Sequence, residues 1–439
     1  MPNSLEINSK IKKYKKIISV SGDKSISIRW VLFSSLADGK SKAKNLLMSE
    51  DVLAAINAIK ILGIKVVYKK NECVIYGKGV NGFKYKKNLK INAKNSGTLG
   101  RLILGLFVNS PFPIKLIGDN SLSKRDFKRI VDPLTKFGAK FKLKNNKNLP
   151  LTIFGAKKLK PIKFTEKKGS AQVKSSIIFA GMRTEGSTFI KAKKSRNHTE
   201  TMSKYLNLPI KVNNKKNYDL IKVEKVKKIK PINYNIPSDI SSGAFFIVLT
   251  AVSKNSQLII KNVNINPSRI GVITILRKMG IKISFQNKKN YKGEKIADIK
   301  IKSAKLIKPI NCPARLNSSA IDEFLIIWIL AAKAKGISYF KNLEELNKKE
   351  SPRLIWGSKI LNKMGVKNIV TKNSIKIYGN PKLKINKKII IKNYLKDHRV
   401  FMTSVVAALS YGGEWSIANP ESIQTSFPNF LKLINELKK

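Results

Sequence analysis

The sequence predicts a two-domain α/β protein built from six similar units, and three observations support this fold class. The 439 residues exceed what one hydrophobic core usually supports. Six apolar segments of helical length recur at nearly even intervals, and six amphipathic helices with short β-branched runs lie between them. Two helices and several strands per unit, repeated six times, fit the length of the chain.

The first set of segments joins a polar or glycine-rich opening to an apolar stretch. Helices that are apolar all round are expected to be buried. A helix N-terminus carries unpaired N–H groups and a partial positive charge, so several such ends that converge would bind a substrate with several negative charges. The segments are spaced by 74, 74, 69, 81 and 78 residues and open at Ser21, Asn95, Gly169, Ser238, Ser319 and Asp397.

The second set consists of amphipathic helices with N-cap-like starts, most of them followed by a glycine and a strand-like run. Runs such as KVVYKK and CVIYG are predicted strands. A helical solenoid is the alternative, but the period is too long and strands alternate with the helices. These helices are expected to begin near Ser49, Ser123, Ser195, Asn266, Glu350 and Ser422.

The formal net charge of +62 has two interpretations. One is nucleic-acid binding. The other is a compositional bias toward Lys that coats the whole surface, because only 11 of the 88 basic residues are Arg and the Lys residues form no single tail or stripe. We favour the second interpretation and do not expect nucleic-acid binding, although a positive field would attract small anionic substrates.

The apolar runs and the cysteines further limit the class of protein that the sequence can encode. The longest apolar run, around Phe324 to Ala332, is too short to span a bilayer, and the N-terminus lacks the apolar core of a secretory signal. Cys73 and Cys312 are the only cysteines and lie in unrelated contexts, so the sequence suggests neither a disulfide framework nor a zinc site. We expect a soluble cytoplasmic protein without membrane association.

Arginine is scarce in this Lys-rich chain and is therefore informative. Its planar guanidinium grips phosphate and carboxylate groups bidentately, which Lys cannot reproduce. Anion binding is the favoured role, and salt bridges to Asp or Glu are the alternative. Six of the 11 Arg are expected in the polar openings of helices: Arg29, Arg101, Arg125, Arg196, Arg353 and Arg399.

The acids and histidines leave more than one role open. Asp322 opens an apolar helix, where it either complements the helix dipole or acts as a general base. Glu350 lies between Lys349 and Arg353, whose charges should lower its pKa, so it belongs either to a salt-bridge cluster or to an acid–base pair. Asp239 fits a simple N-cap. His198 and His398 flank arginines at helix openings and are too few for a convincing metal site.

Several common enzyme motifs do not occur. The segment SGDKSISIR lacks the spacing of a phosphate-binding P-loop, and no G-x-G-x-x-G follows a predicted strand. No H-E-x-x-H is present, and no Ser-His-Asp order is evident. The sequence therefore does not support ATP hydrolysis, dinucleotide chemistry or a serine hydrolase.

The motifs together resemble one family along nearly the whole chain, 5-enolpyruvylshikimate-3-phosphate synthase. SGDKSISIR is similar to its opening P-G-[SD]-K-S-x-S-x-R, NSGTLGR to N-[AS]-G-T-x-x-R, and KKESPRL to V-K-E-S-D-R-L. DHR and TSFPNF follow in the family's order and spacing. GSAQVKS and SRNHTE resemble the branch of the family that has a Ser-Ala-Gln motif.

The resemblance implies a two-domain inside-out α/β barrel. Each domain would contain three β-α-β-α-β-β units, and the N-termini of the buried helices would face the interdomain cleft. Residues 21–236 would form the domain with mainly the shikimate 3-phosphate side of the site. Residues 1–20 and 237–439 would form the second domain, with the catalytic acid and base and part of the phosphoenolpyruvate site.

The resemblance also implies residue roles. Asp322 would be the proton acceptor, Glu350 a proton-transfer partner, and Lys24 a contact to both substrates. The remaining substrate-binding residues implied are Ser25, Arg29, Gly97, Arg125, Ser170, Ala171, Gln172, Lys349, Arg353 and Arg399. No metal or organic cofactor is implied, the expected partners are the two small anionic substrates, and a monomer is expected.

Some positions depart from the family pattern. Ser21 replaces the usual Pro, while Asp126 and Pro352 stand where Pro and Asp are common. Thr425 occupies the position of a Lys that contacts phosphoenolpyruvate in one branch, and His198 occupies that of a Tyr, so a substrate contact by either residue stays open. The rival within the fold is UDP-N-acetylglucosamine enolpyruvyl transferase, which usually carries a reactive Cys in a flexible loop.

Overall fold

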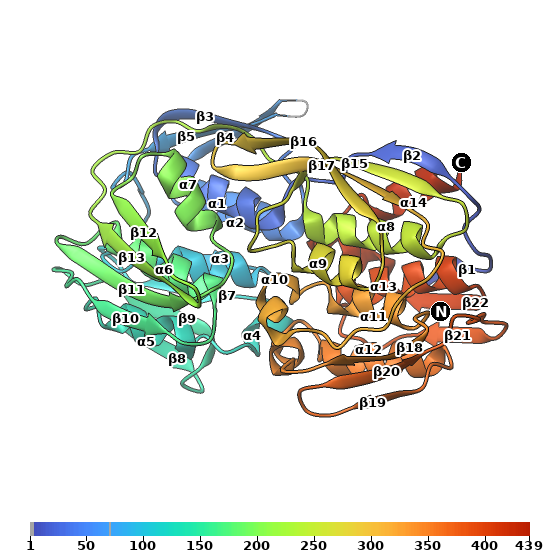
Figure 1. Cartoon of the computed structure of the whole chain (residues 1–439). Helices are drawn as coiled ribbons and strands as arrows, with labels where there is room; N and C mark the ends of the chain where they lie inside the picture. Colours follow the sequence, from blue (N-terminus) through green and yellow to red (C-terminus); the bar gives the residue numbers. More distant parts are fainter. Residues whose placement is uncertain (1–3, 70–71) are drawn as a thin grey trace. The chain divides into compact units, whose positions relative to one another are not determined.

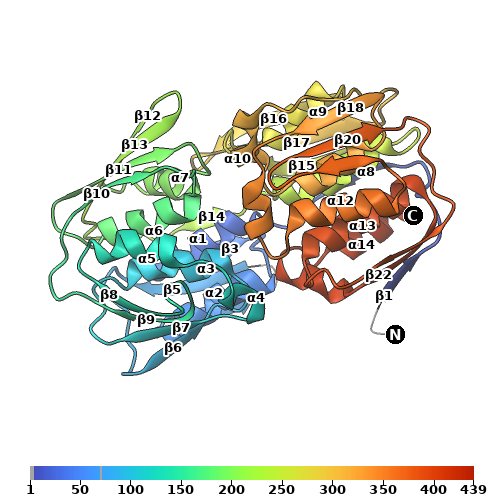
Figure 2. The same ribbon diagram turned by 90° about the horizontal axis from the view of Figure 1, so that it is seen from below.

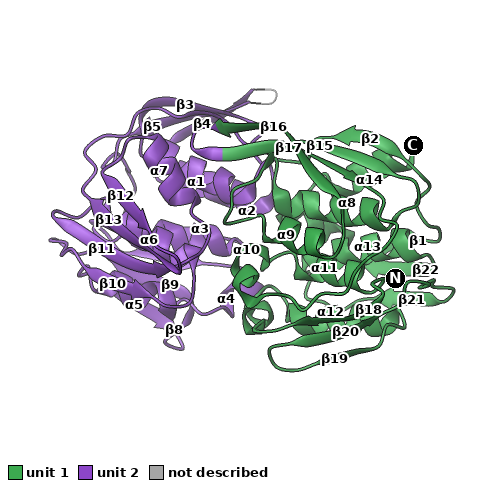
Figure 3. Ribbon diagram, viewed as in Figure 1, with its two compact units in different colours: residues 1–21, 237–290, 295–439 green, residues 22–236, 291–294 purple. Residues whose placement is uncertain are grey.

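The computed structural model describes residues 4–69 and 72–439. The chain forms two compact units, coloured separately in Figure 3. Unit 1 comprises residues 1–21, 237–290 and 295–439, and unit 2 comprises residues 22–236 and 291–294. The chain therefore leaves unit 1 after Ser21, completes most of unit 2, and returns at Pro237.

Three four-stranded sheets form the outer layer of unit 2 (Figure 1). Their strands are β3 Asp38–Lys44, β4 Lys65–Lys69, β5 Glu72–Lys78, β6 Leu89–Asn92, β7 Ile114–Ile117, β8 Lys140–Lys144, β9 Asn148–Phe154, β10 Lys163–Glu166, β11 Ser187–Lys193, β12 Ile210–Asn214, β13 Tyr218–Glu224 and β14 Asn233–Asn235. The orders are β14-β3-β5-β4, β6-β7-β9-β8 and β10-β11-β13-β12. In each sheet the first pair is parallel and the others are antiparallel, so one unit recurs three times.

The helices of unit 2 fall into an inner and an outer set. The inner helices are α1 Lys24–Ser35, α3 Gly97–Leu102 with the 3₁₀ turn η1 Ile103–Leu106, and α6 Ala171–Gly181. The outer helices are α2 Glu50–Ile61, α5 Lys128–Thr135 and α7 His198–Tyr205, and a short α4 covers Asn120–Ser123. The inner helices are buried on nearly all sides, as the sequence pattern predicted, although α1 and α6 also carry several buried polar residues. By contrast, α5 has one apolar face.

Unit 1 repeats this plan with three further sheets. Their strands are β1 Ser4–Ile7, β2 Lys15–Ile18, β15 Gln257–Asn264, β16 Ile283–Tyr291, β17 Glu294–Lys302, β18 Gly336–Phe340, β19 Asn368–Val370, β20 Ile375–Gly379, β21 Lys388–Ile391 and β22 Glu414–Ala418. The orders are β1-β22-β21, β16-β17-β15-β2 and β18-β20-β19. The first sheet joins the two ends of the described chain, because Ser4 pairs with Ala418.

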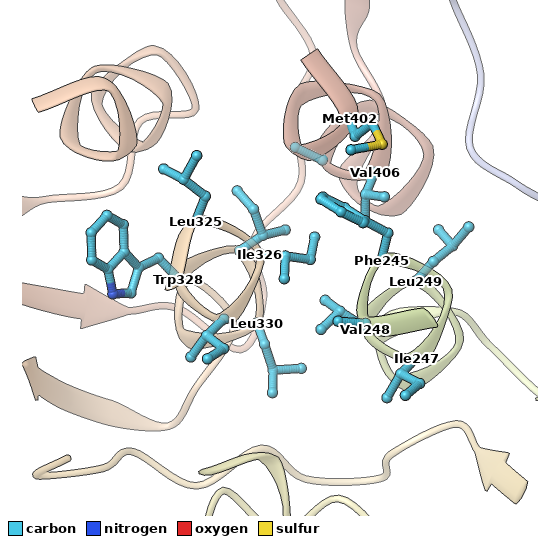
Figure 4. Packing of buried hydrophobic residues seen from close by; sticks show 14 of the residues in the cluster. Phe245, Ile247, Val248, Leu249, Leu325, Ile326, Trp328, Leu330, Met402 and Val406 are labelled. Carbon is cyan, nitrogen blue, oxygen red and sulfur yellow. The ribbon is translucent and has the colours of Figure 1, made fainter. Parts of the chain in front are cut away.

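Three inner helices form the core of unit 1: α8 Ile240–Val252, α11 Phe324–Ala331 and α13 His398–Tyr411. Figure 4 shows their apolar side chains facing one another, with Phe245 and Val248 from α8, Ile326 from α11 and Val406 from α13. The outer helices are α9 Gly271–Lys278, α12 Arg353–Lys363 and α14 Phe430–Lys438, with short turns at η2 Ala314–Leu316, α10 Asn317–Ala320, η3 Glu344–Lys348 and η4 Pro420–Thr425. Figure 2 shows α12 beside α13, and the two helices are in contact.

Side-chain caps define where most inner helices begin. Asp23, Ser96, Ser170, Asp239 and Asp397 each accept a hydrogen bond from a backbone N–H in the first turn of the helix that follows. Such caps satisfy donors that have no partner inside the helix. The prediction that Asp239 is an N-cap is confirmed, since it accepts from the Ser241 N–H at 2.7 Å.

Three expectations are refined by the structure. The described strands form six separate sheets and not one closed barrel, with the apolar helices inside. The segment NSGTLGRLILGLFV forms only a six-residue helix, so Arg101 lies in its last turn and not at its opening. In the η1 turn that follows, Gly105 allows close packing against α6 because it has no side chain. A Cβ on this residue would lie 2.2 Å from the Ser176 carbonyl oxygen. The helix expected from Ser123 begins at Lys128.

No helix within residues 4–69 and 72–439 is both long and apolar enough to cross a membrane.

Candidate functional site

The opening of α1 holds the first group of predicted residues in unit 2. Lys24 is the first residue of α1, and its Nζ donates to Asp51 Oδ2 on α2 at 3.0 Å. Ser25 follows and is buried. The carboxylate of Asp51 thus holds the Lys24 ammonium group at the N-terminus of α1. The unpaired backbone N–H groups at this helix end also favour an anion, so both features would attract the same negatively charged group.

Arg29 lies one turn further along α1 and is almost fully buried. Its Nε donates to Thr199 Oγ1 at 2.7 Å and its Nη2 to Ser175 Oγ at 3.0 Å. Its Nη1 donates to the Ser25 carbonyl oxygen at 3.0 Å. Three helices, α1, α6 and α7, therefore fix this guanidinium.

A second cationic group surrounds the opening of α3. Arg125, between α4 and α5, donates from Nη2 to Asn95 Oδ1 at 2.8 Å. A Cβ on Gly97 would lie 3.0 Å from Arg125 Nη1 and 3.2 Å from Arg101 Nη1. Both guanidinium groups therefore lie against the glycine that begins the helix. A side chain at this position would require the guanidinium groups to move by a few tenths of an ångström.

The opening of α6 contributes Ser170, Ala171 and Gln172. Ser170 is the N-cap of α6, and its Oγ accepts from the Val173 N–H at 3.3 Å. Gln172 accepts from Arg101 Nη1 at 2.7 Å and donates to Thr98 Oγ1 at 3.2 Å, which joins this opening to that of α3.

His198 is the first residue of α7 and is buried. Its Nδ1 lies 2.7 Å from Glu294 Oε1, and Glu294 belongs to the short segment 291–294 of unit 2. Arg196 lies just before the Asn197 cap and is partly buried. The structure thus gives His198 a protein partner at one of its two ring nitrogens.

Unit 1 gathers a second set of predicted residues around Asp322. Lys349 Nζ donates to Asp322 Oδ1 at 3.1 Å, and Arg353 Nη1 approaches the same oxygen at 3.4 Å. Arg399 Nη1 donates to the Asp322 backbone oxygen at 2.6 Å. The predicted proton acceptor therefore lies among three cations, two at or just before the start of α12 and one in the first turn of α13.

Arg353 is the central cation of this cluster, and its side chain is 2% exposed. It donates to Glu350, its neighbour three residues earlier, and to both oxygens of Asp397. Burial opposes the charged form of Arg353, but the carboxylates of Asp397, Glu350 and Asp322 outweigh that effect and raise its pKa. The guanidinium is therefore permanently charged.

Thr425 and His398 lie beside each other in unit 1. Thr425 Oγ1 lies 3.2 Å from His398 Nδ1 and also donates to the Ser422 carbonyl oxygen at 2.9 Å. Thr425 is the last residue of η4 and His398 is the first residue of α13. The position at which one branch of the resembling family has Lys therefore contacts the opening of an inner helix.

Several residues that support the site were not assigned roles from the sequence. Asp397 organises Arg353, and Asp51 holds Lys24. Glu166 accepts from the backbone N–H groups of Lys168 and Gly169 and so shapes the loop before α6. Asp397 had a usable signal, because it stands directly before a predicted buried helix. Asp51 had none, since its partner Lys24 lies in another helix. Glu166 bonds to backbone groups only two and three residues later, but no expected helix begins directly after it.

The two cysteines have buried, unreactive thiols. Burial raises the pKa of Cys73 to about 12 and that of Cys312 to about 11. A thiol with such a pKa is hardly ionised at neutral pH and is a poor nucleophile. Within residues 4–69 and 72–439, no three His, Cys, Asp or Glu side chains are grouped as a metal site would require.

A hollow of about 510 Å³ lies on the sheet formed by β10, β11, β13 and β12. It is lined by residues such as Phe189, Leu220, Lys191 and Lys222, and it contains none of the predicted site residues. The predicted residues of unit 2 instead gather at the openings of the inner helices.

Comparison with solved structures establishes the fold class. The enolpyruvyl transferase NikO from Streptomyces tendae is similar with a TM-score of 0.78 over 99% of this chain and 97% of that one, at 13% identity. EPSP synthase from Acinetobacter baumannii gives a TM-score of 0.86 and 34% identity, covering 98% of this chain and 97% of that one. The chain therefore has the fold of the enolpyruvyl transferases.

Sequence comparison narrows the class to one family. The EPSP synthase (3-phosphoshikimate 1-carboxyvinyltransferase) family model matches residues 8–434. A curated 3-phosphoshikimate 1-carboxyvinyltransferase from Ruthia magnifica subsp. Calyptogena magnifica is 40% identical over 96% of this chain and 94% of its own length. One from Petrotoga mobilis is 36% identical over 96% of each. The chain belongs to the EPSP synthase family.

Proposed function

We propose that the protein transfers the enolpyruvyl group of phosphoenolpyruvate to the 5-hydroxyl of shikimate 3-phosphate, releasing phosphate. The observation that carries the proposal is the cluster of Asp322 with Lys349, Arg353 and Arg399, which joins a candidate proton acceptor to three candidate anion ligands. Family membership over residues 8–434 supports the same activity.

Residues of unit 2 supply most of the proposed shikimate 3-phosphate contacts. The cations Lys24 and Arg29 bind the phosphate and carboxylate groups of this substrate, with Ser25 and Ser170 as hydroxyl donors. The backbone N–H of Ala171 and the amide of Gln172 add neutral donors at the start of α6. Hydrogen bonds already fix Arg29 from three helices, so it loses little freedom when the substrate binds.

The proposed phosphoenolpyruvate ligands are the residues that match the family motifs. In unit 2 these are Arg125, the backbone at Gly97, Lys24 and Gln172. In unit 1 they are Arg353 and Arg399, while Lys349 contacts the shikimate moiety. Four hydrogen bonds from Arg353 go to carboxylates, so phosphoenolpyruvate would exchange with one of the weaker contacts, such as the 3.4 Å approach to Asp322.

The reaction proceeds by addition and elimination. The 5-hydroxyl oxygen attacks the central carbon of phosphoenolpyruvate while the methylene carbon gains a proton, which gives a tetrahedral intermediate. Loss of phosphate and of a methyl proton then restores the double bond. Asp322 accepts the hydroxyl proton, and Glu350 takes part in proton transfer at the methylene carbon.

The abundance of cations follows from the charge of the substrates. Two phosphates and two carboxylates must approach within bonding distance, and fixed Arg and Lys groups offset their repulsion. No metal or organic cofactor takes part in the proposed chemistry. We further propose that the protein acts as a cytoplasmic monomer in the synthesis of chorismate and the aromatic amino acids.

A coupled phosphate-release assay on the purified chain tests the activity. We expect phosphate only when both substrates are present, together with a product whose mass equals that of shikimate 3-phosphate plus an enolpyruvyl group. Release from phosphoenolpyruvate alone, or release that depends on UDP-N-acetylglucosamine in place of shikimate 3-phosphate, would contradict the assignment. Arg29→Ala provides the matched variant, with a raised KM for shikimate 3-phosphate expected.

A further inference from the structure

Three consecutive residues in the first turn of α7 are each held by a different partner in unit 2. His198 contacts Glu294 at 2.7 Å, Thr199 binds Arg29 at 2.7 Å, and Glu200 forms an ion pair with Lys174. The contact of Thr199 is with Arg29, which is proposed to bind the substrate. The contacts of His198 with Glu294 and of Glu200 with Lys174 have no direct part in the proposed chemistry.

The Lys174–Glu200 ion pair is almost completely buried. The N···O distance is 2.6 Å, and the two side chains are 0% and 5% exposed. Taking both charges out of water is costly, and replacing such a pair by apolar residues is often neutral or stabilising. Stability alone is therefore a weak reason for its presence, and a geometric role accounts for it better.

The geometry of neighbouring residues shows what this pair can fix. Lys174 precedes Ser175 on α6, and Glu200 follows Thr199 on α7. Ser175 and Thr199 bind each other through their hydroxyls at 2.7 Å, and both accept from Arg29. The ion pair thus sets the spacing of α6 and α7 one residue away from the two hydroxyls that orient the guanidinium.

The segment 291–294 holds the other side of the same turn. It joins β16 to β17, and Lys292 Nζ lies 5.5, 5.9 and 5.6 Å from the rings of Tyr205, Tyr234 and Tyr291. Lys292 also donates to the Asn233 carbonyl oxygen. These contacts anchor the segment, so that Glu294 is a fixed partner for His198.

We propose that the Lys174–Glu200 and His198–Glu294 contacts position Arg29 by fixing the first turn of α7. All four side chains are positioning residues, because they act through Thr199 and Ser175. The inference rests on the proposed function, since it takes shikimate 3-phosphate as the ligand of Arg29. Loss of either contact should weaken shikimate 3-phosphate binding and leave phosphoenolpyruvate binding largely unchanged.

A double-mutant cycle with Arg29 tests this inference. The combined variant Lys174→Met with Glu200→Gln removes both charges, so no unpaired charge is left buried. By calorimetry on the full chain, we expect its Kd for shikimate 3-phosphate to rise about tenfold when Arg29 is present and less than about twofold in the Arg29→Ala background. The KM for phosphoenolpyruvate should change less than about twofold. Equal losses in both backgrounds, or an unchanged Kd with Arg29 present, would overturn the inference.

Three further variants complete the test. Lys222→Met with Glu224→Gln removes an exposed pair of the same unit, with an N···O distance of 2.7 Å, and should leave the Kd unchanged. Glu200→Asp keeps the negative charge but shortens the side chain. It replaces the Lys174→Met, Glu200→Gln variant in the cycle if that variant does not fold. Glu294→Ala should show the same dependence on Arg29, and additive losses would remove it from the positioning role.

The wild-type protein separates this inference from the proposed function. If it does not bind shikimate 3-phosphate, both ideas fail together. If it binds the substrate and turns over while the variants behave additively with Arg29→Ala, only the positioning role fails.

Discussion

Arg353 and Asp397 are joined by two hydrogen bonds, of 2.9 Å from Nε and 3.2 Å from Nη2, and neither side chain is more than 2% exposed. Asp397 also accepts from Ser351 Oγ at 2.8 Å and from the Arg399 N–H at 2.9 Å. One carboxylate therefore caps α13 and orients the first residue of α12, so two proposed phosphoenolpyruvate ligands depend on it.

Asp397→Asn should destabilise unit 1 and weaken phosphoenolpyruvate binding. The substitution leaves Arg353 buried with less compensating charge, and breaking a buried pair in this way typically costs about 3–5 kcal/mol. Denaturant unfolding at neutral pH measures the loss. Glu421→Gln, which removes an exposed pair with Lys396, is the control and should change the free energy of unfolding by less than about 1 kcal/mol. Equal stability of the two variants would contradict this role for Asp397.

The Arg353–Asp397 pair also predicts how stability depends on pH. Burial raises the pKa of Asp397, but the charge of Arg353 more than offsets it, so the folded pKa lies below the ordinary value. The stabilisation from Asp397 is then complete above its unfolded pKa of about 3.9 and is lost as pH falls through the lower folded value. Arg353 has a raised pKa, so its own contribution would be lost only at strongly alkaline pH.

Denaturant unfolding between about pH 2.5 and 7 measures this dependence. The free energy of unfolding should decrease below about pH 4, with a shallower decrease in Asp397→Asn. Identical slopes for the two proteins would show that other carboxylates dominate the acid limb.

Asp322→Asn should lower kcat by about 10²- to 10⁴-fold, because the amide cannot accept the hydroxyl proton. Hydrogen bonds from Lys349 and Arg353 to its oxygen remain possible, so the Kd for shikimate 3-phosphate should change little. Steady-state kinetics and calorimetry on the same preparation separate these two effects. Near-normal turnover would remove Asp322 from the role of proton acceptor.

Gly97→Ala should raise the KM for phosphoenolpyruvate by about tenfold, equal to about 1.4 kcal/mol. The added methyl group would lie within 3.0–3.2 Å of the guanidinium nitrogens of Arg125 and Arg101 and would displace them. Stability should not fall with affinity, since Ala favours a helix over Gly by about 0.5–1 kcal/mol.

Gly100→Ala is the matched control for Gly97→Ala on the same helix. There the three atoms nearest to an added Cβ belong to Ala93 and Phe127, at 3.4 Å or more, and none of them is a guanidinium nitrogen. Its KM for phosphoenolpyruvate should stay within about twofold of the wild-type value. Equal effects of the two substitutions would mean that helix packing and not guanidinium displacement sets the affinity.

Local patterns in the sequence were sufficient to predict the inner helices and several residues at their openings. Asp239 and Asp397 precede apolar runs, and a cap needs only residues within the next turn, so sequence proximity carries the signal. The short length of α3 was not predicted, because Gly105 in the turn that follows packs closely against α6, a contact that no local pattern encodes.

Contacts between distant segments could not be predicted from the sequence. Lys174 and Glu200 are two among many charged residues, and only the packing of α6 on α7 buries them together. Likewise nothing local distinguishes Tyr291–Glu294 from other turns of a hairpin. Family resemblance narrows the candidate ligands, whereas the partners that orient them depend on tertiary structure.

The pairing of β1 with β22 has a consequence for synthesis on the ribosome. Residues 22–236 are contiguous, so most of unit 2 is able to fold while the nascent chain is still growing. The first strand of unit 1 must instead wait for its partner, since Leu5 pairs with Ile417 and Glu6 accepts from Ser416 Oγ at 2.7 Å. Unit 1 is thus complete only after Glu414–Ala418 has been synthesised, and until then β1 lacks the strand that pairs with its edge.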